Sequence, residues 1–134
     1  MKKIFDPLAR AIETACEGLI YISETDSVIK IFIGEPADNV IASEVLKQVA
    51  VPDEEPVQEV PLDAFFERLT TIKDWYGAAE KERAKRFLDL KELLEKNLRH
   101  LKVFRFGRIQ IAIYVVGLDS AGRLFGVSTQ AVET

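Results

Sequence analysis

Residues on which many active sites depend are scarce in this sequence. It has one cysteine, Cys16, and one histidine, His100, among 134 residues. A lone cysteine excludes an internal disulfide, and a lone histidine excludes a histidine-rich metal site. A catalytic triad would have to use His100, and a cysteine–histidine dyad would have to pair it with Cys16. The composition therefore excludes several classes of enzyme.

Long apolar runs are also lacking. No stretch of about 18 apolar residues occurs, as a membrane-spanning helix would require. The start, residues 1–5, is basic, but Asp6 and Pro7 follow where a signal peptide would continue with an apolar segment. We expect neither a signal peptide nor a membrane span, and the unpaired thiol favours a reducing, cytoplasmic location.

The residues that are present have the composition of an ordinary globular domain. The 134 residues are 48% apolar and 30% charged, with a formal net charge of −4. A chain of this length buries about two thirds of its unfolded surface without disulfides or metals. No internal repeat or low-complexity segment divides it, so we predict a single domain over residues 1–134.

Helix and strand signals alternate along the first half. Asp6 as N-cap and Pro7 in the first turn predict the start of an amphipathic helix. Two β-branched and aromatic runs, 19–22 and 28–33, predict a hairpin with an acidic tip. The remaining predictions in this half are a short helix at 43–49, a connection rich in proline and acids, and an edge strand at 57–60.

The second half begins with helical patterns and ends with strands. Residues 63–69 predict a short helix, and Thr71 with Asp74 resembles an imperfect capping box for the next one. A long helix from about Lys73 or Ala78 to about His100 is predicted by an apolar stripe of Phe87, Leu90, Leu94, Leu98 and Leu101. Strands are predicted at 103–106, 109–116 and 124–128, with a hairpin turn at 119–123. Helices and strands thus alternate in an α+β order that ends in antiparallel strands.

The net charge conceals two regions of opposite sign. Residues 24–63 hold ten acids and two lysines, a sum of −8, whereas residues 67–109 hold twelve bases and seven acids, a sum of +5. An acidic region does not suit DNA or RNA, but it could attract a protein that itself binds phosphates. Two solvated surfaces without a partner would show the same pattern, so that alternative stays open.

Three segments carry a resemblance to a known family. They are 18–24 (GLIYISE), 65–76 (FFERLTTIKDWY) and parts of 117–134, which ends in AVET. Together they resemble the nuclease A inhibitor family, nearly from end to end. The resemblance implies a three-layer α/β/α sandwich of the PR-1-like type, with a mostly antiparallel sheet flanked by helices.

The same resemblance implies a function. It points to a stoichiometric protein inhibitor that binds 1:1 to a metal-dependent, nonspecific DNA/RNA endonuclease of the ββα-metal type. Such a protein protects its host from the nuclease before export. The resemblance implies no catalytic residue, cofactor or metal of its own, and neither nucleic acid nor a membrane as a partner.

Three residues are implied to reach the nuclease. Glu24 matches a glutamate that enters the catalytic cleft, where a carboxylate can imitate the scissile phosphate. Thr134 matches a C-terminal threonine whose free carboxylate reaches the Mg²⁺ of the nuclease. Trp75 matches an interface tryptophan, a residue type that often dominates binding energy. The residues alone leave an alternative open for each of the three. Glu24 could be a solvated turn residue, Thr134 a frayed chain end and Trp75 an aromatic residue of the core.

One position departs from the family pattern. Two residues before the tryptophan the family has a glutamine, and here Lys73 stands in its place. A lysine replaces an amide by a point charge on a longer stem, which leaves the choice of partner open at this position. Asp74 and the pair Thr70 and Thr71 are kept, which indicates that the loop keeps its shape. The predicted partner-binding residues are Glu24, Lys73, Asp74, Trp75 and Thr134.

Three other functions stay open. A domain of the same fold, with Lys73 as a sign of drift, could bind a protein without inhibiting a nuclease. A hydrolase could use paired carboxylates such as Glu24 and Asp26, although no nucleophile or metal cluster accompanies them. RNA could bind to the basic long helix, although seven acids lie in that region and aromatic residues are not interleaved with the bases.

Overall fold

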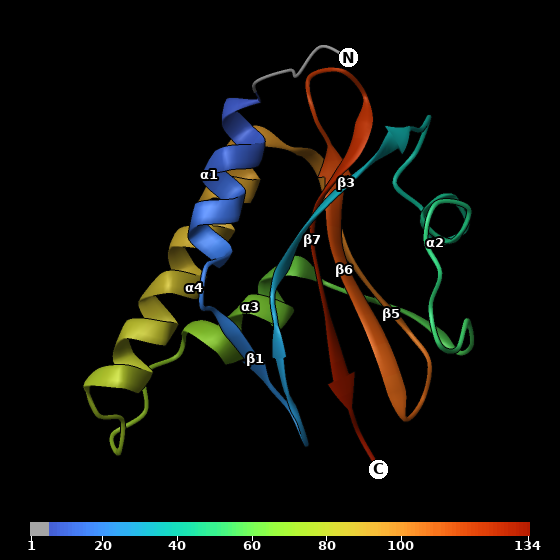
Figure 1. The fold of residues 1–134 in the computed structure, drawn as a ribbon. Coiled ribbons are helices and arrows are strands. Elements are labelled where there is room, and N and C mark those ends of the chain that lie inside the picture. The colour runs from blue at the N-terminus through green and yellow to red at the C-terminus, as the bar shows by residue number, and fades with distance from the viewer. Residues whose placement is uncertain (1–5) are drawn as a thin grey trace.

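The computed structural model describes residues 6–134, which form helices and strands in a mixed order (Figure 1). The elements are α1 (Pro7–Cys16), β1 (Ile20–Ile22), β2 (Asp26–Val28), β3 (Lys30–Pro36), α2 (Ala42–Leu46), β4 (Val57–Val60), α3 (Leu62–Thr70), α4 (Ala78–Asn97), β5 (Arg99–Phe106), β6 (Gln110–Leu118) and β7 (Arg123–Val132). No helix in this part of the chain combines the length and the apolar character needed to cross a membrane.

The strands form a five-stranded antiparallel sheet with the order β3-β7-β6-β5-β4, and β1 and β2 pair separately as a short hairpin. The predicted α+β class and mostly antiparallel sheet are confirmed. The edge position predicted for residues 57–60 is confirmed too, because β4 lies at one end of the sheet. β7, the last strand of the chain, is paired on both sides.

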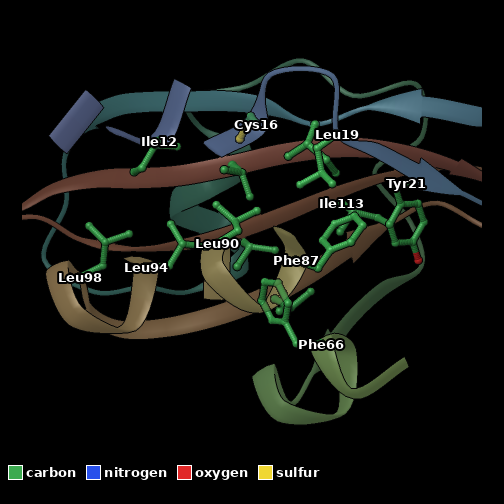
Figure 2. Close-up of a cluster of buried hydrophobic side chains, with 14 of the residues drawn as sticks. Ile12, Cys16, Leu19, Tyr21, Phe66, Phe87, Leu90, Leu94, Leu98 and Ile113 are labelled. Carbon is green, nitrogen blue, oxygen red and sulfur yellow. The ribbon is translucent and has the colours of Figure 1, made fainter. Parts of the chain in front are cut away.

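Each face of the sheet carries its own apolar core. Alternate side chains of a strand point to opposite faces, so Val103 packs on the side of α1, α3 and α4, while the adjacent Phe104 packs on the side of α2. Figure 1 shows α1 and α4 on one side of the sheet and α2 on the other. In Figure 2, side chains from α1, α3, α4 and β6 meet in the larger core.

The first helix begins where the sequence predicts. The Asp6 carboxylate caps α1 by accepting hydrogen bonds from the Leu8 and Ala9 N–H groups at 3.1 and 3.2 Å. Arg123 binds the same carboxylate at 2.9 Å and also binds Asp119 at 2.8 Å. These ion pairs connect the start of α1 to the β6–β7 turn, which is the hairpin turn predicted at 119–123.

The predicted hairpin is correct at its tip but wrong in its second strand. The run 28–33 does not continue one strand: Asp26 and Val28 pair with β1, while Lys30 begins β3, which pairs with β7 in the main sheet. The Thr129 hydroxyl donates to the Val28 carbonyl at 2.9 Å, at the point where the chain leaves the hairpin. A run of β-branched residues can pair with β1 or with β7. The sequence pattern therefore did not show that the run is divided between two strands.

One of the two predicted starts of the long helix, Ala78, is confirmed, whereas its C-terminal end differs from the prediction. Thr71 does not begin it but ends α3, where its N–H and hydroxyl both donate to the Glu67 carbonyl. The long helix begins at Ala78, and Glu80 accepts a hydrogen bond from the Gly77 N–H at 3.1 Å. At its other end α4 stops at Asn97.

The last residue of the predicted helical stripe, Leu101, therefore lies in β5 instead. The residue before it, His100, has a φ of +58°, and the pairing of β5 with β6 shifts between Arg99 and Lys102. With this irregular backbone, the chain passes from the end of α4 at Asn97 to the start of β5 at Arg99. A spacing of three residues between Leu98 and Leu101 thus fits a helix by coincidence.

Candidate functional site

The tip of the β1–β2 hairpin is joined to the end of β7. Within the tip, the Ser23 N–H and hydroxyl both donate to the Thr25 carbonyl, at 2.9 and 3.0 Å. The Val132 N–H donates to the Ser23 hydroxyl at 3.0 Å, and the Glu24 N–H donates to the Val132 carbonyl at 3.2 Å. The hairpin tip and the C-terminal segment are thus held together by both backbone and side chain.

Glu24 and Thr134 are in direct contact, although 110 positions separate them. The Thr134 N–H donates to one carboxylate oxygen of Glu24 at 2.6 Å, and the Thr134 hydroxyl donates to the other at 2.7 Å. These two hydrogen bonds, first the backbone and then the side-chain one, lower the pKa of the exposed Glu24 carboxyl below its usual value. Glu24 is therefore ionised at neutral pH and fixes the last residue of the chain.

A second set of contacts holds the residue before the chain end. The Glu133 N–H donates to the Ile109 carbonyl at 3.0 Å, and the Glu133 carboxylate forms an ion pair with Arg105 at 2.6 Å. Arg105 thus neutralises Glu133. Among the ion pairs of residues 6–134, none includes Glu24.

Sequence analysis missed Ser23, Arg105 and Glu133 as parts of this region. A serine at the start of a tight turn is a recognisable signal, because its hydroxyl can bind a nearby backbone group. The Arg105–Glu133 pair has no comparable signal, since 28 positions separate its members. Only the pairing of the strands brings them together.

Trp75 lies on the surface, in the loop between α3 and α4. Its side chain is 71% exposed, and its ring stands edge-on to Tyr76 with centroids 4.7 Å apart. The Tyr76 N–H donates to the Lys73 carbonyl at 3.0 Å, which makes this part of the loop a turn. Lys73 and Asp74 are exposed as well. The alternative that Trp75 belongs to the core is therefore wrong.

The two groups of predicted site residues lie at the same end of the molecule. In Figure 1 the β1–β2 turn, the C-terminus and the loop between α3 and α4 all lie at the lower end. Tyr21 of β1 stacks on Phe65 of α3, with ring centroids 5.8 Å apart and an angle of 6° between the rings. This contact connects the hairpin to the helix that precedes the Trp75 loop.

An ionised carboxylate on an exposed turn and an exposed aromatic ring at the same end of the molecule are suited to contact another protein. The comparison with known families agrees with this interpretation, because the model of the nuclease A inhibitor-like protein family matches residues 6–134. The chain belongs to the nuclease A inhibitor-like family. No curated protein gives a significant match.

Membership in the nuclease A inhibitor-like family agrees with the resemblance seen in the sequence and implies a nuclease as the partner. It also implies a protein that inhibits rather than catalyses. The match extends to the chain end, so it includes the segment in which Thr134 contacts Glu24.

A cysteine–histidine dyad does not fit the structure. Cys16 is only 6% exposed, and Figure 2 shows it within the apolar core between Ile12 and Leu19. Burial raises the pKa of the Cys16 thiol to about 11, despite the opposing effect of Arg86. The thiol therefore stays protonated at neutral pH, whereas His100 is exposed on the surface.

The paired-carboxylate alternative is weakened by the contacts of Glu24. Both of its oxygens accept hydrogen bonds from Thr134, which lowers the pKa of the carboxyl and makes it a weaker base than an ordinary glutamate. In residues 6–134 there is also no group of three or more histidine, cysteine, aspartate or glutamate side chains that could hold a metal ion.

The basic character of α4 is partly neutralised by neighbouring acids. Lys85 forms an ion pair with Asp89 at 2.9 Å, and Lys91 forms one with Asp63 at 3.0 Å. Asp63 belongs to the acidic region of the sequence, so the two oppositely charged regions meet at this point. A helix with acids spaced among its bases lacks the continuous positive surface typical of RNA binding.

Proposed function

We propose that this protein is a stoichiometric 1:1 inhibitor of a metal-dependent, nonspecific DNA/RNA endonuclease of the ββα-metal type. The contact between Glu24 and Thr134 is the observation that carries the proposal. It gathers the Glu24 carboxylate and the free carboxylate of the chain end at one exposed point. Two anionic groups so placed resemble the charge of a phosphodiester, which a nuclease cleft is built to bind.

The anionic groups act in different ways. The Glu24 carboxylate takes the hydrogen-bond donors that would otherwise hold the scissile phosphate. The Thr134 carboxylate reaches the Mg²⁺ of the nuclease, a hard cation that prefers oxygen ligands. Because Glu24 already orders Thr134 in the free protein, less conformational freedom is lost on binding.

Trp75 supplies an apolar anchor at the same end of the molecule as these anions. An indole ring that is 71% exposed can bury a large area against a partner, and tryptophan is enriched among residues that dominate binding energy. Lys73 and Asp74 flank it on the same exposed turn and complete the contact. Lys73 is the position at which the preference for a particular nuclease is set, because its charge replaces an amide.

We also propose a fold type and a cellular location for this protein. The arrangement of α1, α3 and α4 on one face and α2 on the other supports a three-layer α/β/α sandwich of the PR-1-like type. We place the protein in the cytoplasm as a single domain over residues 1–134, where it blocks the nuclease before export.

Titration tests the proposal directly. The protein with its natural C-terminus is added to a purified nonspecific endonuclease of the ββα-metal type that is digesting DNA, and activity should reach zero at a 1:1 ratio. Glu24→Gln should weaken inhibition about 10- to 100-fold, the range expected for hydrogen bonds to a charged group. Asp26→Asn is the matched control, because it removes one charge from the same turn and should inhibit like the wild type.

The opposite outcome would favour the other protein-binding function. If the protein forms no complex with such nucleases and leaves their activity unchanged at a tenfold excess, inhibition is wrong. The exposed Lys73 would then mark a domain of this family that binds a different protein. An equal loss for Glu24→Gln and Asp26→Asn would show that general charge, and not the contact with Thr134, matters.

A further inference from the structure

An exposed isoleucine stands beside the C-terminal segment on the side opposite the hairpin. Ile109 lies in the turn between β5 and β6, and its side chain is 53% exposed. Its carbonyl accepts the hydrogen bond from Glu133, the residue that precedes the chain end. The backbone of Ile109 is therefore held next to the proposed inhibitory tail.

The turn that carries Ile109 is also held from its other side. The Gly107 N–H donates to the Pro56 carbonyl at 3.0 Å. Gly107 has a φ of +109°, and a Cβ at this position would come within 2.3 Å of the Gln110 carbonyl oxygen, so the turn requires glycine. An apolar side chain presented on a turn fixed at both sides loses little freedom on binding.

Ile109 borders an open groove with an acidic rim. The groove has a volume of about 880 Å³, and its lining includes Asp53, Glu55, Val57, Arg108 and Ile109. Val57, which lies on the edge strand β4, is also an exposed apolar side chain. Glu54 adds a third exposed acid between Asp53 and Glu55. Arg108 is the one basic residue in the lining.

We infer that this groove is a second docking surface for the nuclease, with Ile109 as its apolar centre. The inference rests on the proposed function, because it needs the nuclease to contact the adjacent tail. A protein that binds nucleic acid carries basic residues around its cleft, and these are complementary to the acidic rim. The occupant is an apolar side chain of the nuclease next to such basic residues.

The size of a stable interface supports this assignment. A typical complex buries about 800 Å² on each partner and has an apolar centre with a polar rim. The hairpin tip and the last residue supply mainly charged and polar groups. The groove adds apolar area directly beside them, and the contact from Glu133 to Ile109 makes the two surfaces continuous.

Substitution of Ile109 tests the inference. Ile109→Ala should weaken inhibition of the nuclease about 10-fold, as expected for a truncated central apolar residue. Ile33→Ala is the matched control, since Ile33 is 50% exposed but lies on β3. It should inhibit like the wild type. Thermal unfolding of both variants checks that the fold is kept.

If Ile109→Ala lowers the unfolding midpoint, Val57→Thr decides the question, because it makes the groove polar without changing the shape of the side chain. Wild-type inhibition by the folded variant would overturn the inference. If Glu24→Gln still weakens inhibition in the same assay, the proposed function stands and only the groove is wrong. If the wild-type protein inhibits no nuclease, the proposed function and the assignment of the groove are both wrong.

The acidic rim can be tested separately. The triple variant D53N/E54Q/E55Q should associate with the nuclease about 10-fold more slowly at low salt, and its rate should depend less on salt. The control triple E17Q/D38N/E95Q removes the same charge from exposed positions elsewhere. An equal effect of both triples would show that only the net charge matters, which would contradict a specific docking surface.

Discussion

The C-terminal segment and the Trp75 loop belong to the same proposed interface but are built in different ways. Residues 132–134 are bound to the hairpin tip by hydrogen bonds from Val132, Glu24 and Thr134 and to the neighbouring strands through Glu133. Trp75 instead rests edge-on against Tyr76 with most of its surface in solvent. One region is anchored by directed polar contacts, and the other presents an apolar ring.

This difference follows from what each group has to do. A carboxylate that binds a metal ion or replaces a phosphate must point in a particular direction, because its interactions depend on geometry. Burial of an apolar ring is nearly independent of direction, so a tryptophan can settle into its contact after encounter. The carboxylates therefore need to be held rigidly, whereas Trp75 can adjust its position during binding.

The largest effect should come from moving the terminal carboxylate. Addition of two glycines after Thr134 keeps its N–H and hydroxyl for Glu24 but shifts the free carboxylate away, so inhibition should weaken about 100- to 1,000-fold. The unfolding midpoint should not change. The same two glycines before Met1 are the control. Undiminished inhibition by the C-terminally extended protein would contradict the role of the carboxylate.

Truncation of the anchor should have a smaller effect. Trp75→Ala removes the exposed ring, and inhibition should weaken about 30-fold, whereas the unfolding midpoint should shift by less than about 2 °C. Leu88→Ala is the control, because Leu88 is also exposed, at 40%, but lies on α4. A fall of the midpoint by many degrees would show that the ring supports the fold.

The smallest effect concerns pH. Hydrogen bonds from Thr134 lower the pKa of Glu24 in the folded protein below its ordinary value, so the stabilising contact is present above that ordinary value and is lost as the pH falls through the folded pKa. The Thr134 amide resonance should therefore titrate at a pH below the ordinary pKa of a glutamate. Glu24→Gln separates this step from titration of the terminal carboxyl itself. An identical titration in wild type and variant would argue against the contact.

Local patterns predicted the elements well where one signal dominates. Asp6 and Pro7 marked the start of α1, and the polar residues 23–27 marked a hairpin tip. Errors arose where two structures share a pattern. The β-branched run at 28–33 serves two different sheets, and the step from Leu98 to Leu101 spans the end of a helix and the start of a strand.

The residues of the candidate site were predicted from the resemblance, but their arrangement was not. Glu24, Trp75 and Thr134 were identified by resemblance, yet nothing in the sequence places residues 24 and 134 in contact. That contact depends on β7 running beside the hairpin, which is a long-range property of the sheet. The supporting residue Arg105 was missed for the same reason, whereas Ser23 had a local turn signal that was not recognised.

The position of β7 has a mechanical consequence. The proposed inhibitory tail continues a ten-residue strand that is hydrogen-bonded to β3 on one side and to β6 on the other. A force that pulls the nuclease away through Thr134 acts along this strand and loads many hydrogen bonds at once, as in shear, rather than opening them one by one. Under tension the complex should therefore dissociate before the inhibitor unfolds.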